Sequence, residues 1–484
     1  MLPALRVWLS PLLLGALTVV GFAPFELWFV PLLTLAALFA LNRAATPRAA
    51  FVSGWMFGLG LFGAGVSWVF VSLSLYGGLS APLAFVATAL FCAFIALFPA
   101  LALYGAVRLA PAGGARLLLL PAAWVAMEWV RGWVFTGFPW LTLSYAHTPG
   151  PLAGFAPLLG VYGVSLMAAL LSAALVSRRP NWMTAAILLL PAGHFLLQVS
   201  WTQLIGAPVS VALLQGNVPQ AMKFQPERLS QTLNDYRRDV LASRARLIVL
   251  PETALPLFRA EVPPDYLDSL AQHARAQGGD VLLGLPESEA GGAYYNSLIS
   301  LGASPEGRYR KHHLVPFGEF VPPGFRWLVD QMQIPLGDFA RGAPDQPPIA
   351  AGGQQLAVNV CYEDAFGEER ITAARHATLL VNVSNDAWFG NSLSPRQHLQ
   401  IGAMRSLETG RWQLRANNTG ITAILDASGR ARAELPPFTQ ATLTGTAQGM
   451  TGITPYMRWG NAAVLLIIAS LASTAIFISR KVSV

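Results

Sequence analysis

Residues 354–364 read QQLAVNVCYED, a β-rich run that ends abruptly in a thiol, a phenol and two acids. Short runs of this kind, bounded by polar residues, are typical of strands. Cys361 stands directly after the apolar part, and the only other cysteine, Cys92, lies within a long hydrophobic stretch. A lone cysteine is either buried and inert or kept for chemistry, and this stretch alone does not separate the two.

Similar runs recur between residues 207 and 452, each ending in polar or turn residues. They are VSVALLQGNV, RLIVLPET, DVLLGLPE, NSLISL and ATLLVNVSND. Between them, residues 226–245 and 264–277 have the apolar spacing of helices, and GITAILDASGRARAELP suggests a hairpin around Asp426–Gly429. Strands that alternate with helices predict a layered α/β domain, whose ligands gather at the carboxyl ends of strands.

The chain as a whole is too hydrophobic for an ordinary soluble protein. Apolar residues make up 54% of the chain and charged residues only 12%. The excess is concentrated in stretches that mostly reach the ~20 residues needed to cross a bilayer. The uncharged stretches are 7–23, 27–41, 50–76, 80–107, 151–176, 182–201 and 461–478, and 117–130 carries only Glu128. The sequence therefore predicts eight transmembrane spans.

Basic residues indicate the orientation of these spans. With the N-terminus inside, the inner loops hold Arg6, Arg43, Arg48, Arg108, Arg116, Arg178, Arg179, Arg480 and Lys481. The short outer loops hold only Arg131, as the positive-inside rule predicts. If the first span were instead a cleaved signal peptide, every later loop would lie on the opposite side of the membrane. The basic residues would then lie outside, against the positive-inside rule. We expect both termini in the cytoplasm, and the net charge of +7 requires no nucleic acid partner.

Three segments follow from this topology. Residues 1–206 are expected to form a membrane domain of seven helices, 207–452 an exported catalytic domain, and 453–484 a final span with a short cytoplasmic tail. Within the exported part, residues 318–349 are rich in Pro, Gly and Phe and are long for a plain connection, which favours a lid or shield. Glu128 and Arg131 are either a local helix pair or an acid with an intramembrane function.

Three polar residues lie at or just beyond predicted strand ends: Glu252, Lys311 and Cys361. Lysine is rare here, since the chain has only Lys223, Lys311 and Lys481, and a lysine amid many arginines suggests a site that uses a compact ammonium. A carboxylate can take the proton of a thiol, and an ammonium stabilises both the thiolate and an oxyanion. The set suits acyl transfer through a thioester, provided that the three residues meet in space.

Several motifs carry a resemblance to known proteins. LPET, RKHHLVPFGE and NVCYED resemble the Glu–Lys–Cys motifs of the nitrilase (carbon-nitrogen hydrolase) superfamily. HLVPFGEFVP, VNVSNDAWFG, NNTGIT and EWVRGWVFTGFPW resemble, more narrowly, the bacterial apolipoprotein N-acyltransferase family. The resemblance covers essentially the whole chain. It implies a polytopic α-helical membrane protein of eight spans with an inserted nitrilase-like α–β–β–α sandwich.

The resemblance also implies roles for individual residues. Glu252 would be the general base, Lys311 the stabiliser of the oxyanion and thiolate, and Cys361 the nucleophile. The implied supporting residues are Glu319, Tyr362 and Glu363, and the implied substrate-binding aromatics are Phe224 and Trp388. Phe224 stands where the family has a tryptophan, so any hydrogen bond from an indole is lost there. We expect no cofactor, and the histidine spacing predicts no metal site.

The implied function is transfer of a fatty acyl chain from a membrane phospholipid to the N-terminal amine of a diacylglyceryl-cysteine apolipoprotein. A cysteine thioester would link two half-reactions with ping-pong kinetics. The protein would work in the bacterial inner membrane as a monomer, with its catalytic domain on the periplasmic side. Two alternatives stay open: a membrane-anchored nitrilase-type amidase that hydrolyses a C–N bond, and a non-enzymatic lipid transporter or scaffold.

Overall fold

The computed structural model describes residues 2–482 except 112, 178, 323, 325 and 327–337. Arg178, one of the predicted inner-loop cations, therefore lies outside the described residues. The chain divides into two compact units. We name them the helical unit, residues 1–70, 81–200 and 458–484, and the α/β unit, residues 71–80 and 201–457.

The helical unit is built from apolar helices. Their bounds are α1 (Leu2–Thr18), α2 (Phe29–Leu41), α3 (Pro47–Gly65), α5 (Ala81–Ile95), α6 (Leu97–Leu109), α7 (Gly113–Arg131), α8 (Ala156–Ser177), α9 (Pro180–Ile187), α10 (Leu189–Leu196) and α17 (Ala462–Val482). Helices α1 and α3 approach closely at two glycines. A Cβ atom on Gly15 would overlap the carbonyl oxygen of Phe57, and one on Gly60 that of Leu12. Small residues of this kind let the backbones of membrane helices pack tightly.

Several of these helices are candidate membrane spans. Within the described residues, three helical stretches are long and apolar enough: Ala81–Leu109, Pro151–Ser177 and Ala462–Lys481. Pro47–Gly65 and Val69–Tyr76 would add a fourth if taken together, and Trp8–Gly21 and Phe29–Leu41 are shorter apolar helices. On α17, Leu466 and Phe477 leave 69% and 60% of their surface exposed. A helix that exposes large apolar side chains is suited to a hydrocarbon solvent.

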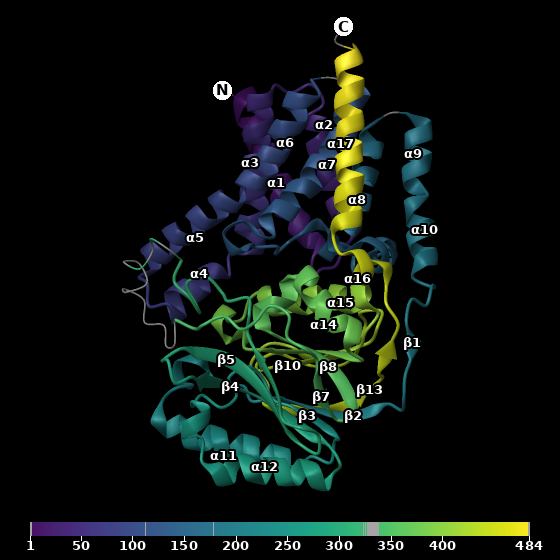
Figure 1. Cartoon of the computed structure of the whole chain (residues 1–484). Helices are drawn as coiled ribbons and strands as arrows, with labels where there is room; N and C mark the ends of the chain where they lie inside the picture. The colour runs from purple at the N-terminus through teal and green to yellow at the C-terminus, as the bar shows by residue number, and fades with distance from the viewer. Residues whose placement is uncertain are drawn as a thin grey trace. The chain divides into compact units, whose positions relative to one another are not determined.

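The α/β unit contains two six-stranded sheets (Figure 1). One has the order β13-β2-β3-β4-β5-β6 and the other β12-β11-β10-β9-β8-β7. The strands are β2 (Val209–Gln215), β3 (Leu247–Val249), β4 (Asp280–Ser288), β5 (Tyr294–Gly302), β6 (Gly307–Arg310), β7 (Ile349–Ala351), β8 (Gln354–Val360), β9 (Leu379–Ser384), β10 (Gln413–Asn417), β11 (Thr422–Leu425), β12 (Ala431–Leu435) and β13 (Ala441–Ala447). The central strands β2–β3–β4 and β8–β9–β10 run parallel, and their neighbours run antiparallel.

The strand runs and helices expected from the sequence are confirmed in this unit. Each of the six β-rich runs contains a strand, and the predicted hairpin is the antiparallel pair β11–β12. The two predicted helices are α11 (Pro226–Ala242) and α12 (Pro264–Ala276). Both begin at a proline, whose fixed φ and missing N–H suit the first turn of a helix.

The period-2 alternation of the strands explains how the layers pack. Val211 and Leu213 of β2 share one apolar core with Val358 of the other sheet. Their neighbours on β2, Ala212 and Leu214, face the opposite way and form a second core with α11 and α12. On the other sheet, α14 (Gly367–His376) and α15 (Ser394–Thr409) pack against the outer face (Figure 1). Both sheets are thus buried on two faces, which leaves the strand ends as places for polar residues.

Candidate active site

Cys361 occupies a sharp turn where β8 ends. The strand stops at Val360, and a short 3₁₀ helix, η8 (Cys361–Ala365), follows at once. Cys361 has φ of 55°, in the left-handed region that residues with a Cβ rarely adopt. Its carbonyl oxygen accepts hydrogen bonds from Asn382 Nδ2 and His398 Nε2, each at 3.2 Å. Strain that surrounding bonds hold in place is frequent at functional sites.

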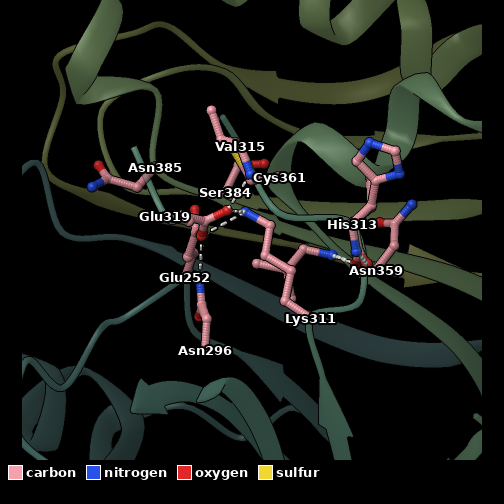
Figure 2. Close-up of polar contacts among 12 residues, drawn as sticks. Glu252, Asn296, Lys311, His313, Val315, Glu319, Asn359, Cys361, Ser384 and Asn385 are labelled. Atoms are coloured by element: carbon pink, nitrogen blue, oxygen red, sulfur yellow. Dashed lines mark hydrogen bonds and ion pairs between the residues drawn. The ribbon is translucent and has the colours of Figure 1, made fainter. Parts of the chain in front are cut away.

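Glu252, Lys311 and Glu319 form one cluster of two acids around an ammonium, in which Glu252 and Lys311 are buried and Glu319 is half-buried (Figure 2). Lys311 follows β6, is 1% exposed, and places its Nζ 2.8 Å from the carboxylate of Glu319 and 3.4 Å from that of Glu252. Asn296 of β5 joins the two acids, because its Nδ2 donates to Glu252 at 2.7 Å and to Glu319 at 3.0 Å. Val315 N also donates to Glu319, at 2.9 Å.

The electrostatics of this cluster connect it to Cys361. Burial alone would lower the pKa of Lys311, but the carboxylates of Glu252 and Glu319 outweigh it and raise that pKa well above its ordinary value. Burial and then the negative charge of Glu252 raise the pKa of the Cys361 thiol well above its ordinary value, against the opposing effect of Lys311. The thiol is therefore protonated at rest, and a nearby base must take its proton before it can attack.

Glu363 connects the turn that carries Cys361 to the segment that carries Lys311. Its carboxylate is fully buried and accepts from Val360 N at 2.7 Å, and from His312 N and His313 N at 2.9 and 3.0 Å. Tyr309 Oη donates to both of its oxygens, at 2.9 and 2.8 Å. The carboxylate thus spans two strand ends, one from each sheet, and fixes the relative position of thiol and ammonium.

The other predicted residues lie around this site in different ways. Tyr362 is buried, with its ring edge-on to Phe366 at 5.1 Å, which is a packing contact. Trp388 lies in η9 (Asp386–Phe389), where its carbonyl accepts from Ser72 Oγ at 2.7 Å and its ring meets that of Tyr76 at 5.9 Å. Phe224 is 37% exposed. Of the predicted shield, residues 318–349, positions 323, 325 and 327–337 lie outside the described residues.

Several residues of the site were not predicted from the sequence. Asn296 of β5 bridges the two acids. The signal available in the sequence was a polar residue at the start of the apolar run NSLISL. His398 bonds the Cys361 carbonyl and pairs through Nδ1 with Asp386 at 3.1 Å, and both are buried. Lys223 donates to the backbone carbonyl of Glu252 at 3.2 Å. Lysine is rare in this chain, but no local pattern in the sequence places Lys223 near Glu252.

Two family models match the chain, one in each part. The model described as "Apolipoprotein N-acyltransferase N-terminal domain" matches residues 14–174. The model described as "Carbon-nitrogen hydrolase" matches residues 210–456, which contain Glu252, Lys311 and Cys361. The nitrilase-like fold expected for the polar part is thereby confirmed.

Individual relatives extend over nearly the whole chain. An apolipoprotein N-acyltransferase from Nitrosomonas europaea is 51% identical over 483 residues, with 97% of each chain covered. One from Ralstonia nicotianae is 46% identical over 482 residues, which are 95% of this chain and 92% of that protein. Among solved structures, an amidase of the nitrilase superfamily from Nesterenkonia AN1 is 20% identical, with a TM-score of 0.38 over 54% of this chain and 97% of that chain. On the strength of the first two, the chain belongs to the apolipoprotein N-acyltransferase family.

Proposed function

We propose that this protein transfers a fatty acyl chain from a membrane phospholipid to the N-terminal amine of a diacylglyceryl-cysteine apolipoprotein, with Glu252, Lys311 and Cys361 as its catalytic triad. The observation that carries the proposal is the Glu252–Lys311–Glu319 cluster, electrostatically coupled to the buried Cys361, in a chain of this family. A base, a cation and a thiol at one place are the minimum that acyl transfer through a thioester requires.

In the first half-reaction, Cys361 Sγ attacks the ester carbonyl of the phospholipid while Glu252 takes the thiol proton. The carbonyl oxygen becomes an oxyanion, and the Lys311 ammonium stabilises it. The C–O bond to the glycerol then breaks, and Glu252 returns the proton to the departing alkoxide. The products are a lysophospholipid and an acyl thioester on Cys361.

In the second half-reaction, the neutral amine of the apolipoprotein attacks the thioester carbonyl. Glu252 takes a proton from the attacking nitrogen, and Lys311 again stabilises the oxyanion. The C–S bond breaks, the sulfur recovers a proton from Glu252, and the product is an amide. Release of the first product before the second substrate reacts gives ping-pong kinetics. Glu319 keeps the Lys311 ammonium in place, at 2.8 Å.

A member of this family with several apolar helices is a bacterial membrane protein. We propose further that residues 1–206 and 453–484 form eight spans in the inner membrane, with both termini in the cytoplasm. Residues 207–452 would form an α–β–β–α sandwich on the periplasmic side. The working form would be a monomer. The distribution of basic residues supports this orientation. An enzyme with two lipid substrates needs its reactive groups near the bilayer surface.

Intact-protein mass spectrometry of the detergent-purified protein tests the proposal. With phospholipid present, we expect a fatty-acyl mass increment on Cys361 that hydroxylamine removes, and no increment on a folded Cys361→Ala variant. An unmodified Cys361 in the presence of phospholipid would sink the proposal. If a small amide labelled Cys361 instead, the protein would be a nitrilase-type amidase.

A further inference from the structure

The acid–lysine cluster beside Cys361 is not balanced in charge. Glu252 and Glu319 each bring a carboxylate, and Lys311, which pairs with both, brings one ammonium. With all three ionised, the cluster carries a net charge of −1. A negative cluster opposes ionisation of a buried thiol, since like charges in a region of low dielectric constant repel strongly. Glu252, Asp386 and Glu319 all act against the Cys361 thiolate, and Lys311 acts for it.

A second lysine lies within electrostatic range of these groups. Lys223 is 4% exposed, and its Nζ donates to the backbone carbonyl of Glu252 at 3.2 Å. Among the residues that the structure describes, it forms no direct ion pair. Its charge nevertheless interacts with those of Glu252 and Cys361. Burial of an ammonium without a paired carboxylate costs free energy. A buried lysine at position 223 is therefore better explained by a need for positive charge there than by packing.

We propose that Lys223 is a positioning residue of the acyl transfer: a second cation that offsets the excess carboxylate and favours the ionised form of Cys361. The inference rests on the function proposed above. Lys223 acts on the thiol through the electrostatic field of its ammonium and through its hydrogen bond to the backbone of Glu252. It needs no contact with the reacting atoms. Burial lowers the pKa of Lys223 to about 8, partly opposed by Glu252 and Cys361, so the residue keeps its charge at neutral pH.

Alkylation of Cys361 by iodoacetamide tests the assignment without any lipid substrate. The rate is followed at the Cys361 peptide from pH 6 to 10, in the full-length detergent-purified protein. Removal of the cation by Lys223→Met should shift the profile upward by about one pH unit, which is about a tenfold slower reaction at neutral pH. Lys223→Arg, which keeps the charge, should restore the neutral-pH rate. Lys481→Met, the same change on the last helix, is the matched control and should react as the unchanged protein does.

The outcomes separate this inference from the function it rests on. A folded Lys223→Met protein with the unchanged alkylation rate and pH profile overturns the inference. A slow Lys223→Arg protein overturns it as well, because the effect would then follow side-chain shape and not charge. Should Lys223→Met fail to fold, Lys223→Gln gives the same test. Failure of the unchanged protein to form a thioester would instead overturn the proposed function, whatever the alkylation shows.

Discussion

In the helical unit, Glu128 and Arg131 lie three residues apart on α7, and each bonds the segment that follows the helix. Glu128 Oε1 accepts from Leu143 N at 2.8 Å and from Trp124 Nε1 at 3.2 Å. Arg131 donates to the backbone carbonyls of Phe138 and Trp140. In the α/β unit, Glu252 and Lys311 are also buried and Glu319 is half-buried, but these three side chains bond mainly one another.

The difference lies in the partners of the charged groups. Glu128 and Arg131 bond three backbone groups of the segment that follows α7, the amide of Leu143 and the carbonyls of Phe138 and Trp140, besides the side chains of Trp124 and Thr142. These bonds favour a structural role for the pair, in shaping that segment, over an intramembrane function. The carboxylates of the α/β cluster share the ammonium of Lys311 and the amide of Asn296. A buried charge held by backbone dipoles stabilises structure, whereas one held by other ionisable side chains is available for chemistry.

The largest expected effect follows from Glu252→Gln. The amide preserves the shape and an oxygen for Asn296, but it cannot accept the thiol proton, so thioester formation should fall by about 10²–10⁴-fold. The acyl increment on Cys361 against time is the measurement. Glu227→Gln, at an exposed position on α11, is the matched control and should leave the rate unchanged. A Glu252→Gln rate within threefold of normal would remove Glu252 from the role of base.

A large loss of stability is expected from Glu363→Gln. Both oxygens of Glu363 accept hydrogen bonds, so an amide NH₂ must face a donor on one side. Leaving one such buried donor unsatisfied costs about 1–3 kcal/mol in the free energy of unfolding. Thermal unfolding in detergent measures this cost, and Glu368→Gln, at an exposed position in the first turn of α14, is the control. Unfolding at the same temperature as the unchanged protein would contradict the bridging role of Glu363.

Glu128→Gln sharpens the contrast between the two units, and its effect should be smaller. One oxygen of Glu128 accepts both bonds, so an amide oxygen can keep them and the loss should be about 1 kcal/mol. The alkylation rate of Cys361 should not change, because Glu128 shapes the backbone of its own unit only. A changed rate or pH profile would show that Glu128 takes part in the chemistry, and the comparison would fail.

The sequence could predict the strand ends that carry Glu252, Lys311 and Cys361, because apolar runs followed by polar residues are local signals. It could not predict Asn296 as the bridge between two acids, since that contact depends on the registers of β4, β5 and β6. Lys223 precedes α11 and is brought to Glu252 by the pairing of β2 with β3. Such contacts depend on tertiary packing, which leaves no periodicity in the chain.

The same limit applies to the turn at Cys361. The motif NVCYED predicts a reactive thiol after a strand, but the φ of 55° at Cys361 is sustained by Asn382 and His398, which lie 21 and 37 residues further along. No neighbouring residue signals that strain. In the sequence, eight apolar stretches predict eight spans, and the loop charges favour one orientation. Among the described residues, three helical stretches are by themselves long and apolar enough to cross a membrane.

The smallest effect is expected from Phe224→Trp, which introduces the tryptophan implied by the family resemblance. Phe224 is exposed and has no buried charge to support, so a larger ring should change the thioester rate by less than about threefold. Phe438→Trp, at a similarly exposed aromatic of the same unit, is the matched control. A gain of tenfold or more in Phe224→Trp alone would mean that an indole at this position contacts the acyl donor. Exposed side chains would then contribute to the chemistry of the α/β unit alongside its buried charges.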